Sequence, residues 1–251
     1  LKASTSVSLN GSIILSANYD AVANPAGNET GAQTLPFLNK TSGHVELGKG
    51  SAIEILPEWA STDKVAGTKL SLPSKIDISG KTIHMASDAT ILAPNANVTL
   101  SAGVWNFISG ASQDSTMMFS NGQVYLEPGA LINVAGTTDA VAPISENIIV
   151  VQLRGSELAD SPLQRLGNLR GVNLVVDLRK TGVYNGFTWV GTPLGDLTGY
   201  LNLVQRTVSE LTTAGGSVKV NAGSSTVIKN GATIDVSSGW TNYEGGFVQT
   251  S

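Results

Sequence analysis

The segment His44–Ile55 reads HVELGKGSAIEI, with two short runs of alternating apolar residues on either side of Gly50. In the first run Val45 and Leu47 are two positions apart, and the second run repeats this spacing. Side chains two positions apart lie on the same face of a β-strand. Glycine readily adopts the positive φ that a tight corner requires. The segment therefore predicts two short strands joined by a corner, with the apolar faces of both strands turned inward.

The same pattern returns along the chain, with Asn or Asp at the corner in the looser copies. Its copies are Val124, Leu126, Gly129, Ile132, Val134; Thr226, Ile228, Gly231, Ile234, Val236; Thr90, Leu92, Asn95, Val98, Leu100; and Ile83, Met85, Asp88, Ile91, Ala93. A unit this short cannot bury its apolar face alone, so copies must stack. The repeat predicts an all-β fold of the β-solenoid type, with about 8–10 coils about 4.8 Å apart. Such a fold favours a scaffold or adhesive rod over an enzyme.

The repeat divides the chain into three stretches. Residues 1–136 are expected to form regular coils with an insertion near residues 18–41, and residues 214–251 to form regular coils again. Between them, residues 137–213 break the pattern. We interpret residues 1–251 as a single β-helix segment in which the irregular stretch is an elaboration on one side of the solenoid. A separate domain is the alternative.

Few elements are expected within the irregular stretch. Apolar runs predict strands at Asn147–Leu153 and Val172–Asp177. The segment Leu201–Leu211 fits a strand or a short helix equally, and Tyr184–Tyr200 is expected to be a long loop. The chain opens on Leu1 and closes on the strand-like run Phe247–Gln249. We therefore expect it to be a fragment of a longer polypeptide.

The composition fits a narrow aliphatic interior. Of the 251 residues, 41% are hydrophobic but only 6% aromatic, and 28 are glycines that can serve the many turns between short strands. The net charge is −4, and no basic stripe is present, which excludes nucleic-acid binding by counterion release. No apolar stretch reaches the length of a membrane-spanning helix. The chain has no cysteine, so disulfides, thiolate catalysis and cysteine metal sites are excluded.

Several stretches resemble the filamentous-haemagglutinin family of exoproteins, which Gram-negative bacteria export by two-partner secretion. The likeness covers most of residues 43–251, and the irregular stretch is its most specific part. The matching stretches are VQLRGSEL at Val151–Leu158, DSPLQR at Asp160–Arg165, WVGTPL at Trp189–Leu194, LTTAGG at Leu211–Gly216, DVSSGW at Asp235–Trp240 and YEGG at Tyr243–Gly246.

The resemblance implies a right-handed parallel β-helix that is secreted and displayed on the bacterial cell surface. It implies a structural rod with a role in adhesion or biofilm formation. The expected partners are an outer-membrane barrel transporter for the parent chain, flanking β-helix of the same polypeptide or end-to-end copies of it, and host or environmental glycans. The transporter-recognised secretion module of the family has no match in this sequence, so the chain is expected to be internal rod.

Aromatic side chains are the candidate contacts for glycans or other partners. Trp189, Tyr184, Trp240 and Tyr243 are expected in loops or at strand ends. Exposed rings there would stack on sugar faces. The alternative is that these rings cap the core where loops fold over the stack.

A β-helical polysaccharide lyase or glycoside hydrolase is the alternative function. A glycosidase needs two carboxylates on one surface, but Glu46 and Glu54 are expected on different strands that face different directions. Asp177, Arg179 and Lys180 lie at the end of an expected strand, without a second acidic residue beside them. We interpret them as a surface ion pair.

The two histidines do not suggest a metal site. His44 and His84 both occupy outward positions, and no acidic partner is expected beside them. The sequence therefore predicts no catalytic, cofactor-binding or metal-binding residue, and no enzyme. A self-assembling extracellular filament subunit, stacked end to end through open β edges, is a further alternative.

Overall fold

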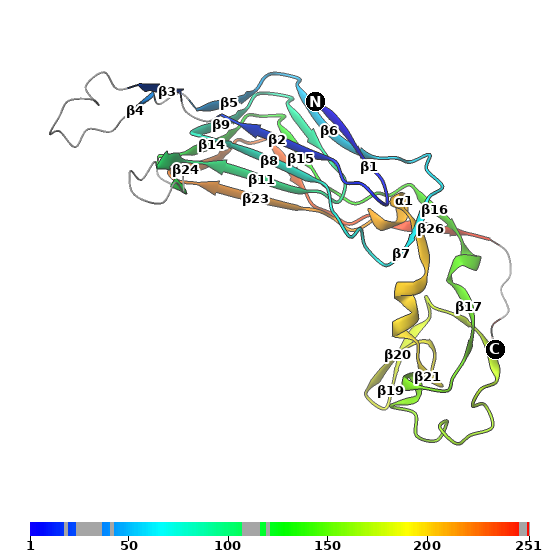
Figure 1. Ribbon diagram of the computed structural model, residues 1–251. Helices are drawn as coiled ribbons and strands as arrows, with labels where there is room; N and C mark the ends of the chain where they lie inside the picture. The colour runs from blue at the N-terminus through cyan, green and yellow to red at the C-terminus, as the bar shows by residue number, and fades with distance from the viewer. Residues whose placement is uncertain are drawn as a thin grey trace. The chain divides into compact units, whose positions relative to one another are not determined.

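The computed structural model describes residues 1–17, 20–23, 37–40, 43–106, 116–118, 121–245 and 250. The described chain is mostly β-structure with a few short helices (Figure 1). It divides into two compact units. The first unit contains Leu1–Pro57, Leu72–Gly136 and Ala214–Gly239, and the second contains Glu58–Ser71, Thr137–Thr213 and Trp240–Ser251.

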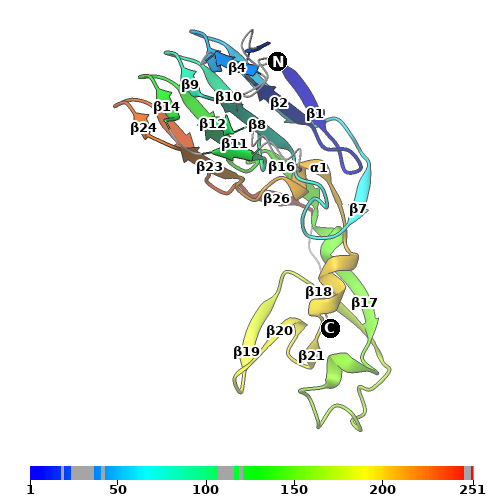
Figure 2. The ribbon, with the colours of Figure 1, turned by 60° about the vertical axis from the view of Figure 1, so that its left-hand side comes forward.

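Three stacked parallel sheets form the first unit (Figure 2). Sheet 1 runs β1 (Lys2–Thr5), β6 (Ala52–Pro57), β10 (Thr90–Leu92), β15 (Leu131–Asn133) and β25 (Thr233–Asp235). Sheet 2 runs β2 (Ser12–Ser16), β8 (Lys75–Gly80), β11 (Asn97–Ala102) and β23 (Ser217–Ala222). Sheet 3 runs β5 (His44–Leu47), β9 (Thr82–Met85), β14 (Gln123–Leu126) and β24 (Ser225–Ile228). Each circuit of the chain visits sheets 2, 3 and 1 in turn, which is a β-solenoid-like repeat.

Columns of aliphatic side chains fill the interior of the first unit. The strand register places Ile53, Ile91, Ile132 and Ile234 above one another in sheet 1. The first three are at most 2% exposed. A fully buried aliphatic side chain contributes about 1.5–3 kcal/mol. Because neighbouring circuits present matching side chains, one period-2 pattern in the sequence builds a continuous core.

The corner between sheets 3 and 1 carries the predicted residues with positive φ. Gly50 has φ 68°, Asp88 61°, Gly129 83° and Gly231 91°. The Gly50 amide donates to the Ser87 carbonyl at 3.2 Å, which links corners of neighbouring circuits. The inward positions predicted at the Gly50 and Gly129 units are all buried, so these two copies of the pattern are confirmed.

Two sequence predictions about the repeat are wrong. In the copy starting at Thr90, Val98 and Leu100 are buried as predicted, but Thr90 and Leu92 in its first half are only half-buried. The buried residues there are Ile91 and Ala93, as the overlapping copy that starts at Ile83 predicts. Pairing of Ile91 with Ile53 sets this register, and a shift of one residue reverses the faces of a strand. The expected number of coils is also too high, because each circuit takes three strands. The described part of sheets 2 and 3 holds four strands each.

Two antiparallel pairs also belong to the first unit: β3 (Asp20–Ala23) with β4 (Phe37–Lys40), and β12 (Val104–Asn106) with β13 (Thr116–Met118). The first pair lies within the insertion expected near residues 18–41. The rest of that insertion, at 18–19, 24–36 and 41, lies outside the described residues.

The second unit has an apolar core of its own. Its strand pairs are β7 (Lys64–Ala66) with β22 (Gln205–Thr207), β16 (Ala140–Pro143) with β26 (Thr241–Glu244), β17 (Ile148–Gln152) with β18 (Asn173–Asp177), and β19 (Thr181–Tyr184) with β20 (Phe187–Thr192) and β21 (Gly195–Asp196). Its helices are η1 (Ile144–Asn147), η2 (Ser156–Leu158), η3 (Thr198–Leu203) and α1 (Val208–Leu211). The core contains Val151, Leu153, Leu158, Leu174, Val176, Leu178, Leu197 and Val204.

The irregular stretch 137–213 forms the main part of this second unit. The expected loop at Tyr184–Tyr200 is wrong, because β20 and β21 lie there. Residues 240–251, expected as regular coil, group with the second unit. Among the described residues, no helix has both the length and the apolar character needed to cross a membrane.

Replacement of Ile132 by aspartate is expected to unfold or strongly destabilise the protein. Ile132 is 0% exposed in the middle of its column, and burying an unpaired carboxylate there costs several kcal/mol, on the order of 3 or more. Asn133→Asp is the control, because the Asn133 side-chain oxygen accepts from the Ala135 amide at 2.9 Å and a carboxylate can do the same. Thermal unfolding would show a large loss for the first variant and little change for the second. Equal melting temperatures would contradict the inward assignment.

Alanine at Gly129 is expected to destabilise the corner by about 1–2 kcal/mol, since its φ of 83° is costly for a residue with a Cβ atom. Gly48→Ala is the matched control. A Cβ atom at Gly48 meets nothing within 4 Å, and Gly48 is not among the glycines with positive φ. Denaturant unfolding measures both. A loss for Gly48→Ala equal to that for Gly129→Ala would contradict the role of the corner.

Candidate functional site

A tight hairpin in the second unit presents the candidate site (Figure 1). Strands β19 and β20 pair antiparallel, with Tyr184 opposite Phe187 across a two-residue turn. The turn residues Asn185 and Gly186 have φ of 49° and 83°. Two successive positive φ values match the type I′ turn, whose twist suits a hairpin and which favours Asn-Gly. The local sequence therefore fixes the hairpin and its register.

Three aromatic side chains lie on one face of this hairpin. Tyr184 and Phe187 are directly opposite each other, and Trp189 is opposite Gly182. Directly opposite residues share a face, as do residues two apart on one strand. Tyr184, Phe187 and Trp189 therefore share one face, on which Tyr184 is 66% and Phe187 53% exposed.

Gly182 sets the position of the Trp189 ring. A Cβ atom built on Gly182 would lie 2.5 Å from Trp189 Cζ2 and 3.0 Å from Nε1. The indole therefore packs directly against the backbone of the paired strand. Its orientation is held by the hairpin, which lowers the entropy that a ligand contact would otherwise cost.

The three rings line a cavity of about 530 Å³. This volume falls within the range of small-molecule pockets, about 300–1,000 Å³. The rest of its lining is Asp160, Ser161, Pro162, Leu163, Gln164, Asn185, Thr188, Pro193, Leu194, Gly195 and Asp196. Apolar walls with polar groups at their edges are typical of ligand-binding sites, and exposed rings in such a cavity mark an interaction site.

The hairpin that lines this cavity packs against the core of the second unit. Gly191, at the end of β20, has φ 81°, and a Cβ atom there would lie 2.9 Å from Leu197 Cδ1. Leu197 is fully buried in the core of this unit. The close approach of β20 to the core anchors the hairpin that carries the rings.

The four predicted contact residues do not form one site. Tyr184 and Trp189 line the same cavity, whereas Trp240 and Tyr243 do not contribute to it. Trp240 precedes β26 and is 57% exposed, and the Tyr243 ring lies 5.1 Å from the Arg179 guanidinium. Sequence reasoning missed Phe187. The Asn-Gly pair at residues 185 and 186, flanked by aromatic residues, is the hairpin signal that would have found it.

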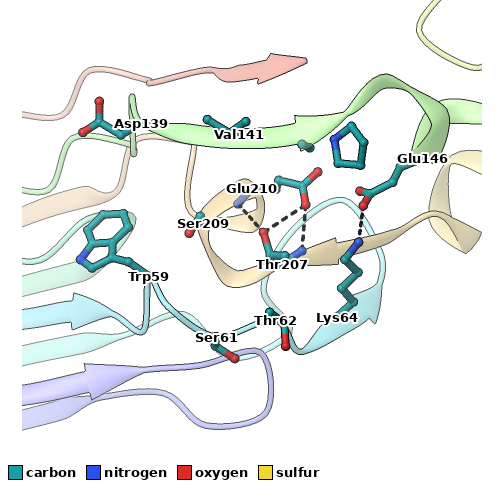
Figure 3. Close-up of a pocket in the computed structure, with 12 residues that line it drawn as sticks. Trp59, Ser61, Thr62, Lys64, Asp139, Val141, Glu146, Thr207, Ser209 and Glu210 are labelled. Atoms are coloured by element: carbon teal, nitrogen blue, oxygen red, sulfur yellow. Dashed lines mark hydrogen bonds and ion pairs between the residues drawn. The ribbon is translucent and has the colours of Figure 1, made fainter. Parts of the chain in front are cut away.

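A second cavity in the same unit has a volume of about 720 Å³ and contains three carboxylates (Figure 3). The Glu210 carboxylate accepts from the Thr207 amide at 2.9 Å and hydroxyl at 3.1 Å, in a capping box at the start of α1. Glu146 pairs with Lys64 through one oxygen, and its other oxygen is buried without a hydrogen-bond partner among the described residues. The carboxylates of Glu210 and Glu146 thus both have structural roles. Asp139 supplies the third carboxylate of the cavity.

The acidic residues considered from sequence are separated or engaged. Glu46 lies in sheet 3 and Glu54 in sheet 1, where Glu54 pairs with Lys2 at 2.7 Å. Asp177 accepts from Arg179 Nη2 at 2.6 Å and from Nε at 3.0 Å. The hydrogen bond from the Arg179 guanidinium lowers the pKa of Asp177, and the same bond to the Asp177 carboxylate raises the pKa of Arg179, which keeps this pair ionised.

The prediction that the histidines lack acidic partners is wrong for His84. Its Nδ1 lies 2.7 Å from Glu46 Oε2, and its Nε2 lies 3.1 Å from Glu127 Oε1, because β5, β9 and β14 are neighbours in sheet 3. Hydrogen bonds from the Ser87 hydroxyl and amide lower the pKa of Glu127. Within the described part of the chain, no group of three or more His, Cys, Asp or Glu side chains is placed to hold a metal ion.

No family model, curated protein or solved structure matches this chain. The functional argument therefore rests on the aromatic cavity of the β19–β20 hairpin and on the stacked sheets of the first unit.

Proposed function

We propose that the chain is a rod segment of a large secreted bacterial exoprotein of the filamentous-haemagglutinin type, and that its second unit carries an adhesive site for glycans. In this proposal the first unit is a short length of right-handed parallel β-helix. The parent chain leaves the cell through an outer-membrane barrel transporter and is displayed at the cell surface. The observation that carries the adhesive role is the aromatic cavity of Tyr184, Phe187 and Trp189.

The chemistry of the cavity suits a sugar. The C–H faces of a pyranose ring are apolar and pack against aromatic rings, while its hydroxyls need hydrogen-bond partners around the edge. Trp189 supplies a ring held in place by Gly182, and Gln164 and Asn185 supply amides in the same lining. Rigid aromatic side chains provide contact area at low entropic cost.

The proposal does not include catalysis. To act as a lyase or hydrolase site, the cavity of Figure 3 would need carboxylates that are free to act as acid, base or nucleophile. In the cavity of Figure 3, Glu210 caps a helix and Glu146 pairs with Lys64. These engagements disfavour a hydrolytic role for that cavity.

A filament subunit is the second candidate, favoured by the last circuit of the first unit. Strands β23, β24 and β25 each pair with only one strand among the described residues. Two apolar side chains of this circuit remain open, with Ile228 51% and Val236 48% exposed. An unpaired edge beside an open apolar core favours stacking on another copy of the chain, head to tail.

Glycan binding is tested by screening the purified chain on a glycan array and measuring the affinity of a positive glycan. Trp189→Ala is expected to weaken that affinity at least tenfold, about 1.4 kcal/mol, through loss of the packed ring. Trp240→Ala is the matched control, because Trp240 is an exposed tryptophan outside the cavity. Tyr184→Ala, at a largely exposed side chain, tests the site without disturbing the Gly182 contact. Absence of any binding, or equal losses for Trp189→Ala and Trp240→Ala, would contradict the proposal.

End-to-end stacking is tested by sedimentation over a wide concentration range. The wild-type chain is expected to associate as its concentration rises. Ile228→Lys is expected to abolish association without loss of stability, because the side chain is already half exposed and a lysine can reach solvent. A wild-type chain that stays monomeric throughout would refute the filament candidate.

A further inference from the structure

The charged side chains that line the aromatic cavity are all negative. Among the described residues that line it, Asp160 and Asp196 are the only ones with charged side chains, and both are exposed. No lysine, arginine or histidine is in this lining. Like charges at close range disfavour binding, so sulfated and uronic-acid glycans are poor ligands for this cavity.

Both carboxylates have unused acceptor capacity. Asp196 accepts from the Thr198 amide at 2.9 Å and hydroxyl at 2.5 Å through Oδ1 alone. Asp160 has no hydrogen bond or ion pair to another described residue. The cation nearest to it along the chain is Arg165, and its guanidinium donates to the backbone carbonyls of Leu158 (3.1 Å) and Ala159. Within the described part of the chain, neither aspartate therefore forms an ion pair with a cationic side chain.

We infer that this cavity selects a glycan that carries a free, protonated amino group, as glucosamine units do. This inference rests on the proposed glycan binding. The pyranose ring packs against Trp189 and its neighbours, and the ammonium group donates to Asp160, Asp196 or both. Ammonium groups are also attracted to the faces of aromatic rings, so the rings and the carboxylates favour the same ligand.

The contribution of the amino group to binding is measured with three β-1,4-linked tetramers, of glucosamine, N-acetylglucosamine and glucose. These sugars differ only in the substituent at C2. Titration calorimetry with the whole chain at low salt is expected to give at least about tenfold tighter binding of the glucosamine tetramer than of the other two. The preference should shrink as salt is added, because partly exposed ion pairs are screened.

The variants Asp160→Asn and Asp196→Asn locate this effect in the cavity. At least one is expected to reduce the affinity for the glucosamine tetramer several-fold and to leave that for the glucose tetramer unchanged. Asp139→Asn is the matched control, since Asp139 is an exposed aspartate of the same unit that lines the other cavity.

Each outcome decides between the proposals. If no tetramer and no array glycan binds, both the glycan site and its preference for an amino group are refuted. If the three tetramers bind equally and Trp189→Ala weakens all of them, the glycan site stands and the amino-group inference is overturned. If the glucosamine tetramer binds more tightly but neither Asp160→Asn nor Asp196→Asn changes this, the preference arises elsewhere and the inference is likewise overturned.

Discussion

The register between successive circuits of the first unit is the constraint on which the rest of this protein depends. Parallel pairing places Ile53, Ile91 and Ile132 in one column, and neighbouring columns repeat the arrangement in all three sheets. Backbone hydrogen bonds run between neighbouring circuits, so each circuit adds one layer of side chains from the three sheets to the core. A shift of one residue in any strand would turn its apolar side chains to solvent.

This arrangement allows the connections between strands to contain long insertions. The chain leaves the stack after Pro57 and after Gly136, and it rejoins near Leu72 and Ala214. The residues of both excursions contribute to the second unit, where β7 from the first pairs with β22 from the second. The second unit buries an apolar cluster of its own, and the hairpin that carries the aromatic rings packs against this cluster. Loops on rigid scaffolds commonly carry binding sites for this reason.

The repeat was predictable from sequence because side chains alternate between the two faces of a strand, so apolar residues at every second position mark the buried face. The Gly50 and Gly129 units follow directly from period-2 spacing and a corner residue. The same pattern fits Thr90 and Ile91 in two overlapping ways, and only pairing with Ile53 decides between them. The site was less predictable. Asn185-Gly186 is a local signal for the hairpin, but nothing local in the sequence brings Asp160 into the same lining as Asp196, since that depends on how the second unit folds.

Hydrogen–deuterium exchange of the whole chain, measured with and without a glucosamine tetramer, tests the central claim that the second unit binds glycans while the stack supports it. The account predicts that amides in the middle strands β9, β10, β11 and β14 exchange slowest and do not respond to the sugar. It predicts slower exchange on binding in the β19–β20 hairpin and in residues 160–164. Protection confined to the first unit, or no change in the hairpin at saturating sugar, would contradict it.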